Sequence, residues 1–199
     1  MTILPITIVG EPVLHTSAQE VSSIDQQIHT LIDDMQQTMH AAPGVGLAAP
    51  QVGVGLRIFT WHYSGSHPYD RFLRRHAGID IPDQGRSGVV INPSLELSDF
   101  REEALDREIE REGCLSVPGY SYPLRRADHA ILTGCDEQGN PLRIEAYGWL
   151  ARIFQHEFDH LNGTLYCDRV NAPYDEVVSR AITREGWGKP GLTWVPPSH

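Results

Sequence analysis

The chain has 199 residues, of which 40% are hydrophobic and 21% charged, so it can bury a core and lacks the composition of a disordered protein. Its formal net charge of −10 disfavours nonspecific binding to nucleic acids, whose phosphates repel an acidic protein. The chain starts without a signal-peptide pattern, and its apolar runs are shorter than the roughly 20 residues that span a bilayer. We therefore expect one cytoplasmic domain.

The first predicted elements are an extended arm and a helix. Residues 1–13 are apolar and are expected to lie along the core. Apolar residues then recur at helical spacing, which predicts a helix at residues 24–41. Ser23 stands three residues before Gln26, a pattern typical of a capping box, and Pro43 ends the helix.

The middle of the chain alternates loops with short strands. Residues 44–55 form a loop rich in small side chains, and a strand is predicted at 56–61. Glycine and proline recur through residues 63–87, which predicts a long polar surface loop. A short strand follows at 88–92. The charged stretch 103–111 predicts no particular secondary structure.

The last third of the chain contains a predicted hairpin and two predicted helices. Strands are expected at residues 130–133 and 142–146, around a turn that contains glycine. Helices are predicted at 148–161 and at 173–184. The tail, 188–199, is rich in proline and glycine and is expected to be irregular.

The most specific motif is His156-Glu157-Phe158-Asp159-His160 within the second helix. Histidines four residues apart share one helix face, so both imidazoles can bind the same cation. Glu157 lies next to the first histidine and can reach a metal-associated water without being a ligand. The alternative is a helix with two exposed histidines, and the pattern favours metal binding over it.

A catalytic metal site of this type needs a third protein ligand and an open position. The candidates are Cys114, Cys135, Cys167, His129 or a distant carboxylate. Cys114 follows a glycine and precedes a proline–glycine turn, an arrangement that presents a side chain well. Spacing alone gives Cys114 only a modest preference.

A third segment, Gly44-Val45-Gly46-Leu47-Ala48-Ala49-Pro50-Gln51, is rich in glycine and alanine. It lacks the Lys-Ser/Thr ending of a phosphate-binding loop and the glycine spacing of a dinucleotide fold. It is either a tight turn or a backbone wall beside a peptide substrate, with Gln51 as an amide donor.

Together the three segments resemble the peptide deformylase family. That family carries G-φ-G-L-A-A-x-Q, where φ is aliphatic, then E-G-C-L-S and Q-H-E-x-D-H-L-x-G. This chain matches them at residues 44–51, 112–116 and 155–163, in the same order and with similar spacing. The likeness covers most of residues 1–185. One departure is Arg152, which stands where some relatives have an aliphatic residue.

The resemblance implies an α+β fold, with small, mostly antiparallel sheets packed around the HExxH helix, and a single catalytic domain over 1–199. The implied metal ligands are Cys114, His156 and His160. The implied catalytic groups are Glu157 as general base and acid, Gln51, and the backbone N–H of Leu115. The implied substrate contacts are Val45, Gly46, Gly113, Trp149 and Ile153. Glu112 is expected to pair with Arg126 behind the cysteine.

The implied reaction is hydrolysis of the N-formyl group from the formylmethionine of newly made polypeptides, with release of formate. The implied metal is Fe²⁺, with Zn²⁺, Ni²⁺ or Co²⁺ as substitutes. The implied partners are formyl-methionyl nascent peptides and at most a transient ribosome contact, without specific nucleic acid or membrane. The tail has no basic helix that would dock on a ribosome.

Two alternative functions differ in their metal ligands. An HExxH metallopeptidase more often takes a downstream histidine or glutamate as third ligand, and after His160 the next histidine is His199. A closed structural site would have four protein ligands, and Cys167 could be the fourth. The upstream cysteine segment favours the deformylase over both.

Overall fold

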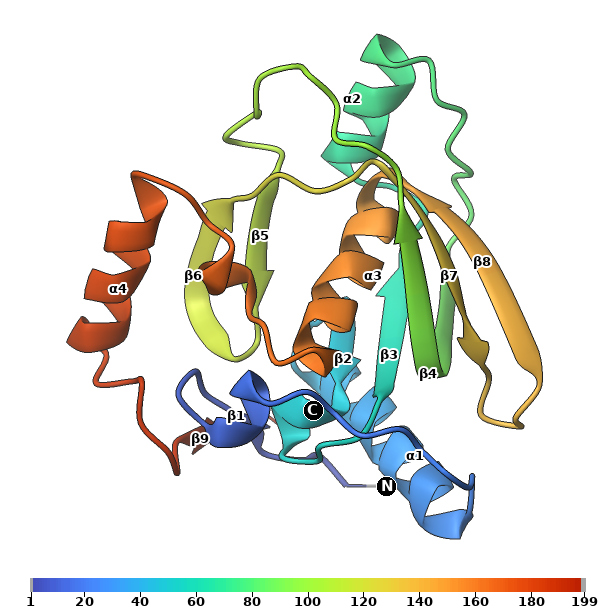
Figure 1. Ribbon diagram of the computed structural model, residues 1–199, viewed down its shortest axis with the longest axis vertical. Coiled ribbons are helices and arrows are strands. Elements are labelled where there is room, and N and C mark those ends of the chain that lie inside the picture. Colours follow the sequence, from blue (N-terminus) through green and yellow to red (C-terminus); the bar gives the residue numbers. More distant parts are fainter. Residues whose placement is uncertain (1, 198–199) are drawn as a thin grey trace.

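A computed structural model describes residues 2–197, and helix α3 runs through its centre against a five-stranded antiparallel sheet (Figure 1). The strand order in that sheet is β2-β3-β4-β7-β8. The strands are β2 (Gly46–Ala48), β3 (Ile58–Tyr63), β4 (Arg86–Leu97), β7 (His129–Cys135) and β8 (Pro141–Tyr147). The α+β architecture expected from the family resemblance is confirmed.

Two smaller antiparallel sheets complete the strand inventory of the described residues. One is the hairpin of β5 (Arg111–Cys114) and β6 (Val117–Pro123), which lies beside α3 (Figure 1). The other pairs β1 (Ile6–Thr7) with β9 (Thr193–Trp194). The prediction of an irregular tail is therefore partly wrong, because residues 193 and 194 form a strand. Met1, Ser198 and His199 lie outside the described residues.

Helix α3 (Gly148–Leu161) begins and ends where its sequence pattern predicts. Its apolar face packs on the sheet, where Phe154 contacts the rings of Phe59 and Trp61. Burying such large side chains stabilises the fold by roughly 1.5–3 kcal/mol each. The same packing fixes the rotation of α3, and so it fixes which way the HExxH side chains point.

Three other helices surround this centre: α1 (Gln26–Ala41), α2 (Pro68–His76) and α4 (Tyr174–Arg184). Helix α1 begins two residues later than predicted, and the capping interpretation was wrong. Asp25, and not Ser23, is the N-cap, because its carboxylate accepts hydrogen bonds from the N–H groups of Gln27 and Ile28.

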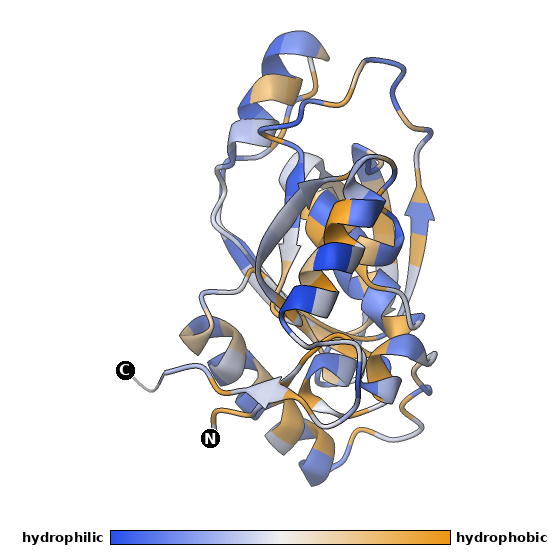
Figure 2. Ribbon diagram, turned by 90° about the vertical axis from the view of Figure 1, so that its left-hand side faces the viewer, coloured by the Kyte–Doolittle hydropathy of each residue, from blue (hydrophilic) through white to orange (hydrophobic). Residues whose placement is uncertain are grey.

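The prediction of a polar loop at residues 63–87 was also partly wrong, because residues 68–76 form α2. Figure 2 shows alternating hydrophilic and hydrophobic bands along this helix, as expected for a helix with one buried face. Its buried side chains are Tyr69, Asp70 and Leu73. Three short 3₁₀ helices, Pro12–His15, Ala49–Val52 and Tyr166–Asp168, connect the larger elements. None of the described helices is long and apolar enough to cross a membrane.

Candidate active site

The structure brings Cys114, His156 and His160 together, although the cysteine is far from the histidines in sequence. The Sγ atom of Cys114 lies 3.2 Å from Nε2 of His160, which in turn lies 3.2 Å from Nε2 of His156. All three donor atoms lie within 4.8 Å of one another. Cys114 ends β5, where a register shift after Gly113 interrupts the β5–β6 pairing. Such bulges turn a side chain away from the regular strand direction.

This donor set fits a divalent metal ion. Ligand atoms of a four-coordinate zinc-like site lie about 3.4–3.8 Å apart, given metal–ligand distances of about 2.1–2.3 Å, and the observed spacings are close to that. Burial would lower the pKa of His156, but its hydrogen bond and charge interaction with Cys114 outweigh burial and raise that pKa well above the ordinary value. Because a histidine binds metal in its neutral form, a metal ion at this site would have to displace that proton from His156.

A buried ion-pair network orients the first histidine. Nδ1 of His156 lies 2.7 Å from Oε1 of Glu112, so that Nε2 faces the other donors. The expected pair of Glu112 with Arg126 is present at 2.6 Å, and Arg126 also contacts Asp159 at 2.6 Å. Burial would raise the pKa of Glu112, but the charge of Arg126 and the bond with His156 hold it well below its usual range. Glu112 therefore stays ionised behind the histidine.

Glu157 lies beside the donor set as a buried carboxylate, with 2% of its surface exposed. Burial raises the pKa of Glu157 to about 7, which suits a group that exchanges protons near neutral pH. Its Oε2 atom has no hydrogen-bond partner among the described residues. That oxygen is available to accept a proton from water at the site.

Gly46 leaves the space that the Glu157 carboxylate occupies. A Cβ atom on Gly46 would lie 2.1 Å from Oε1 of Glu157 and 2.5 Å from its Cδ, closer than any real contact. The missing side chain of this glycine is therefore needed to leave room for the Glu157 carboxylate. Residues 46–48, expected to be loop, form strand β2 at the edge of the sheet.

We expect Gly46→Ala to lower kcat about 100-fold, because a displacement of about 1 Å in a catalytic group has effects of this size. Gly55→Ala is the matched control, since its Cβ would meet only a Val13 methyl group at 3.8 Å. Steady-state kinetics of both variants, with thermal melts to compare folding, provide the measurement. Equal activity of the two variants would contradict the role of Gly46.

Gln51 contacts the cysteine, and Leu115 follows it in the chain. The Oε1 atom of Gln51 accepts a 2.9 Å hydrogen bond from the N–H of Ala48, and this turns its amide nitrogen toward Cys114 Sγ at 3.5 Å. The backbone carbonyl of Leu115 accepts a 2.8 Å hydrogen bond from Nε1 of Trp194. The second contact was not predicted, since the tail was expected to be irregular.

A cavity of about 470 Å³ opens over these groups. Its lining includes all five expected substrate contacts, Val45, Gly46, Gly113, Trp149 and Ile153, together with Gln51, Cys114, Leu115, His156 and Glu157. Polar groups therefore gather at one place in a largely apolar cavity, as in most small-ligand sites.

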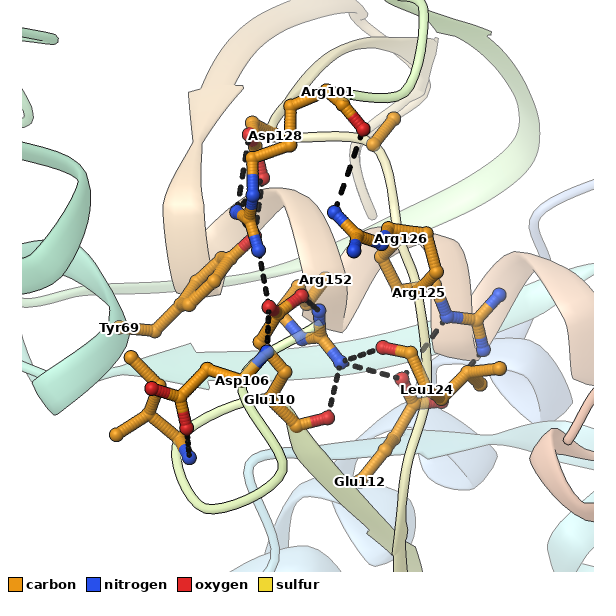
Figure 3. A network of polar contacts seen from close by, with 12 residues as sticks. Tyr69, Arg101, Asp106, Glu110, Glu112, Leu124, Arg125, Arg126, Asp128 and Arg152 are labelled. Atoms are coloured by element: carbon orange, nitrogen blue, oxygen red, sulfur yellow. Dashed lines mark hydrogen bonds and ion pairs between the residues drawn. The ribbon is translucent and has the colours of Figure 1, made fainter. Parts of the chain in front are cut away.

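Sequence reasoning missed part of this lining. Arg152 contributes to the cavity although its side chain is only 1% exposed. Its guanidinium donates hydrogen bonds to the carbonyl oxygens of Glu110 and Leu124, inside the network of Figure 3. Tyr120 and Trp194 also line the cavity. The sequence shows that Arg152 interrupts the apolar pattern of the helix, but it does not show which groups the arginine contacts.

Comparison with known proteins gives a consistent result. The family model described as polypeptide deformylase matches residues 3–176. The peptide deformylase of Mycolicibacterium paratuberculosis is 46% identical over 201 residues, covering 98% of this chain and 95% of the relative. The crystal structure of peptide deformylase from Ehrlichia chaffeensis superposes with a TM-score of 0.74 at 35% identity, covering 93% of this chain and 97% of that one. A Met-Ala-Ser-bound class I type b peptide deformylase from Acinetobacter baumannii superposes with a TM-score of 0.66 at 32% identity, covering 84% and 98%.

Proposed function

The chain belongs to the polypeptide deformylase family and is an enzyme, and on this premise we propose that it hydrolyses the N-formyl group of formylmethionine on newly made polypeptides and releases formate. One observation carries the proposal. Two histidines and a cysteine direct their donor atoms to one point, and a buried carboxylate with a pKa of about 7 lies beside them. A relative with the peptide Met-Ala-Ser bound supports the substrate class.

Cys114, His156 and His160 are the proposed metal ligands, with Fe²⁺ as the proposed resident ion and Zn²⁺, Ni²⁺ or Co²⁺ as substitutes. A mixed sulfur and nitrogen set suits each of these ions. When bound, the ion would supply Lewis acidity at the scissile carbonyl and make a nearby water more acidic. Burial lowers the pKa of His160 well below its ordinary value, which keeps that imidazole in the neutral form that binds metals.

The side chains around the cysteine would handle the proton and the developing charge. Glu157 would take a proton from the attacking water at its unpartnered Oε2 and return it to the departing amine nitrogen. As the formyl carbon becomes tetrahedral, negative charge develops on its oxygen. The amide of Gln51 and the backbone N–H of Leu115 are the proposed donors to that oxygen.

The proposed substrate backbone would extend between two strand edges. Gly46 lies on β2, the edge strand of the large sheet, and Gly113 lies on β5 of the hairpin. An extended peptide can add to such edges through backbone hydrogen bonds. The methionine side chain would enter the apolar part of the cavity, between Val45, Ile153 and Trp149.

The proposed activity assigns residues 1–199 to a single catalytic domain. Its substrates are nascent formyl-methionyl peptides, which places the activity in the cytoplasm, where such peptides are made. Any ribosome contact would be transient.

The test is to purify the protein without oxygen, load it with Fe²⁺ and incubate it with formyl-Met-Ala-Ser. We expect equal amounts of formate and free amine, and little or no reaction with acetyl-Met-Ala-Ser. Parallel loading with Zn²⁺, Ni²⁺ and Co²⁺ ranks the ions by kcat/KM. If none of these forms releases formate, the proposed function is wrong.

Replacement of Gln51 by leucine is expected to lower kcat about 10²–10³-fold, the usual effect of removing one donor to a developing oxyanion. Metal content should stay unchanged, because Gln51 is not a ligand. Gln138→Leu, at an exposed turn, is the matched control. A Gln51 variant with normal kcat would show that the Gln51 amide is not a donor to the oxyanion.

A further inference from the structure

Helix α2 reaches the proposed substrate cavity through Trp149. The imidazole ring of His67, the N-cap residue of α2, stacks on the Trp149 ring with 3.7 Å between centroids and 12° between planes. Trp149 lines the cavity, whereas His67 does not. The stacking contact therefore supports the cavity wall from behind.

The first turn of α3 is also held by α2. Asp70 is fully buried, and its Oδ1 accepts a 2.7 Å hydrogen bond from the backbone N–H of Trp149. Its Oδ2 accepts a 2.9 Å hydrogen bond from the Tyr63 hydroxyl. The N-cap of α3, Tyr147, has no side-chain cap of its own, so Asp70 satisfies a backbone donor that this helix end would leave unpaired.

Gly148 permits that close approach. It has a φ of +59°, and a Cβ there would lie 2.3 Å from Oδ1 of Asp70. Both the left-handed backbone and the missing side chain are therefore needed where α2 meets α3. Trp149, the next residue, is tied to α2 at both its backbone and its ring.

Arg152 provides a second contact for the Trp149 ring. Its guanidinium carbon lies 5.9 Å from that ring and 5.0 Å from the ring of Tyr69 on α2. The Tyr69 hydroxyl donates a hydrogen bond to Asp128, and Arg101 joins the same cluster (Figure 3). Burial lowers the pKa of His67 to about 4, so near neutral pH His67 places no second positive charge beside Arg152.

The position of Trp149 along α3 sets its distance from the reaction centre. Trp149, Ile153 and Glu157 are spaced four residues apart and so share one face of the helix. At 1.5 Å per residue, the backbone of Trp149 lies about 12 Å from that of Glu157. The indole therefore lines the cavity about two helical turns from Glu157.

We propose that His67 is a positioning residue for substrate specificity: by fixing the indole of Trp149, it sets the length of unbranched apolar side chain that the cavity accepts at the first residue of the substrate. This inference rests on the proposed deformylase function. His67 and Asp70 act through Trp149 and touch neither substrate nor metal. When the Trp149 indole is held in place, it can contact a long side chain at the first substrate residue, whereas a short side chain does not reach it.

The test compares His67→Ala, His67→Phe and His76→Ala on two substrates, formyl-Met-Ala-Ser and formyl-Ala-Ala-Ser. His76 is the matched control, because it is an exposed histidine at the other end of α2 that stacks on Phe72. We expect His67→Ala to lower kcat/KM about tenfold for the methionyl substrate, mainly through KM, and less than about twofold for the alanyl one, in line with the loss of apolar pocket contacts.

His67→Phe keeps a ring that can stack, so its kcat/KM for each substrate should lie within about twofold of the wild type. The control His76→Ala should also stay within about twofold. Thermal melts of all variants show whether folding is intact. Equal losses on both substrates, a fall in kcat alone, or no change in His67→Ala would overturn the inference while the wild type remains active. A wild type that hydrolyses neither substrate would instead overturn the proposed function.

Discussion

Glu157→Ala is expected to retain its metal and to lose about 10²–10⁴-fold in turnover, the range for removal of a general acid–base group. The carboxylate is buried against Gly46, and its pKa of about 7 suits proton exchange near neutrality. It is not among the three clustered donor atoms, so metal content should not fall. Metal analysis and formate release on the same preparation provide the measurement.

Glu157→Gln keeps the shape of the side chain and removes its ability to take a proton, so it should be as inactive as the alanine variant. Glu145→Gln, at a half-exposed position on β8, is the control and should keep wild-type activity. The assignment of Glu157 fails if either Glu157 variant retains more than about a tenth of wild-type turnover. A loss of less than about tenfold is smaller than a general acid–base group is expected to cause.

Cys114→Ala is expected to lose its metal and, with it, nearly all activity. Two histidines alone leave one ligand fewer than the three that catalytic sites of this kind use. Because structural and catalytic ions contribute to folding, the variant should also melt at a lower temperature than the metal-loaded wild type. Metal content after dialysis, measured by elemental analysis, tests the expectation directly.

The two other cysteines supply matched controls. Burial raises the pKa of Cys167 to about 12, which disfavours its thiolate form. Neither Cys167 nor Cys135 belongs to the donor cluster found among the described residues. Cys167→Ala and Cys135→Ala should therefore keep their metal. Equal metal loss in the Cys167 variant would favour the closed, four-ligand structural site instead.

Helix α3 could be predicted because its signals are local. The apolar spacing and the two histidines all lie within the fourteen residues of the helix, and α3 has the expected bounds. The identity of the third candidate ligand, by contrast, could not be predicted from local signals. It depends on how the β5–β6 hairpin packs beside α3. Spacing alone gave Cys114 only a modest preference over Cys135, which ends strand β7.

Helix α2 could not be predicted because its start carries a residue that usually breaks helices. Pro68 occupies the first helical turn, where proline is tolerated because its missing N–H would be unpaired there anyway. The cap residue of α1 was mispredicted for a different reason, which also depends on the fold. Ser23 and Asp25 are both good N-caps by residue type, and only the fold determines which carboxylate or hydroxyl meets the free N–H groups.

The hydrogen bond from Trp194 to the carbonyl of Leu115 has a consequence for the order of events during synthesis. Its two partners are 79 residues apart, and Trp194 lies on β9, the last strand among the described residues. Domains generally fold as units while the chain emerges from the N-terminal side. A nascent copy therefore contains all three motifs before it can form the contact that holds the backbone at Leu115.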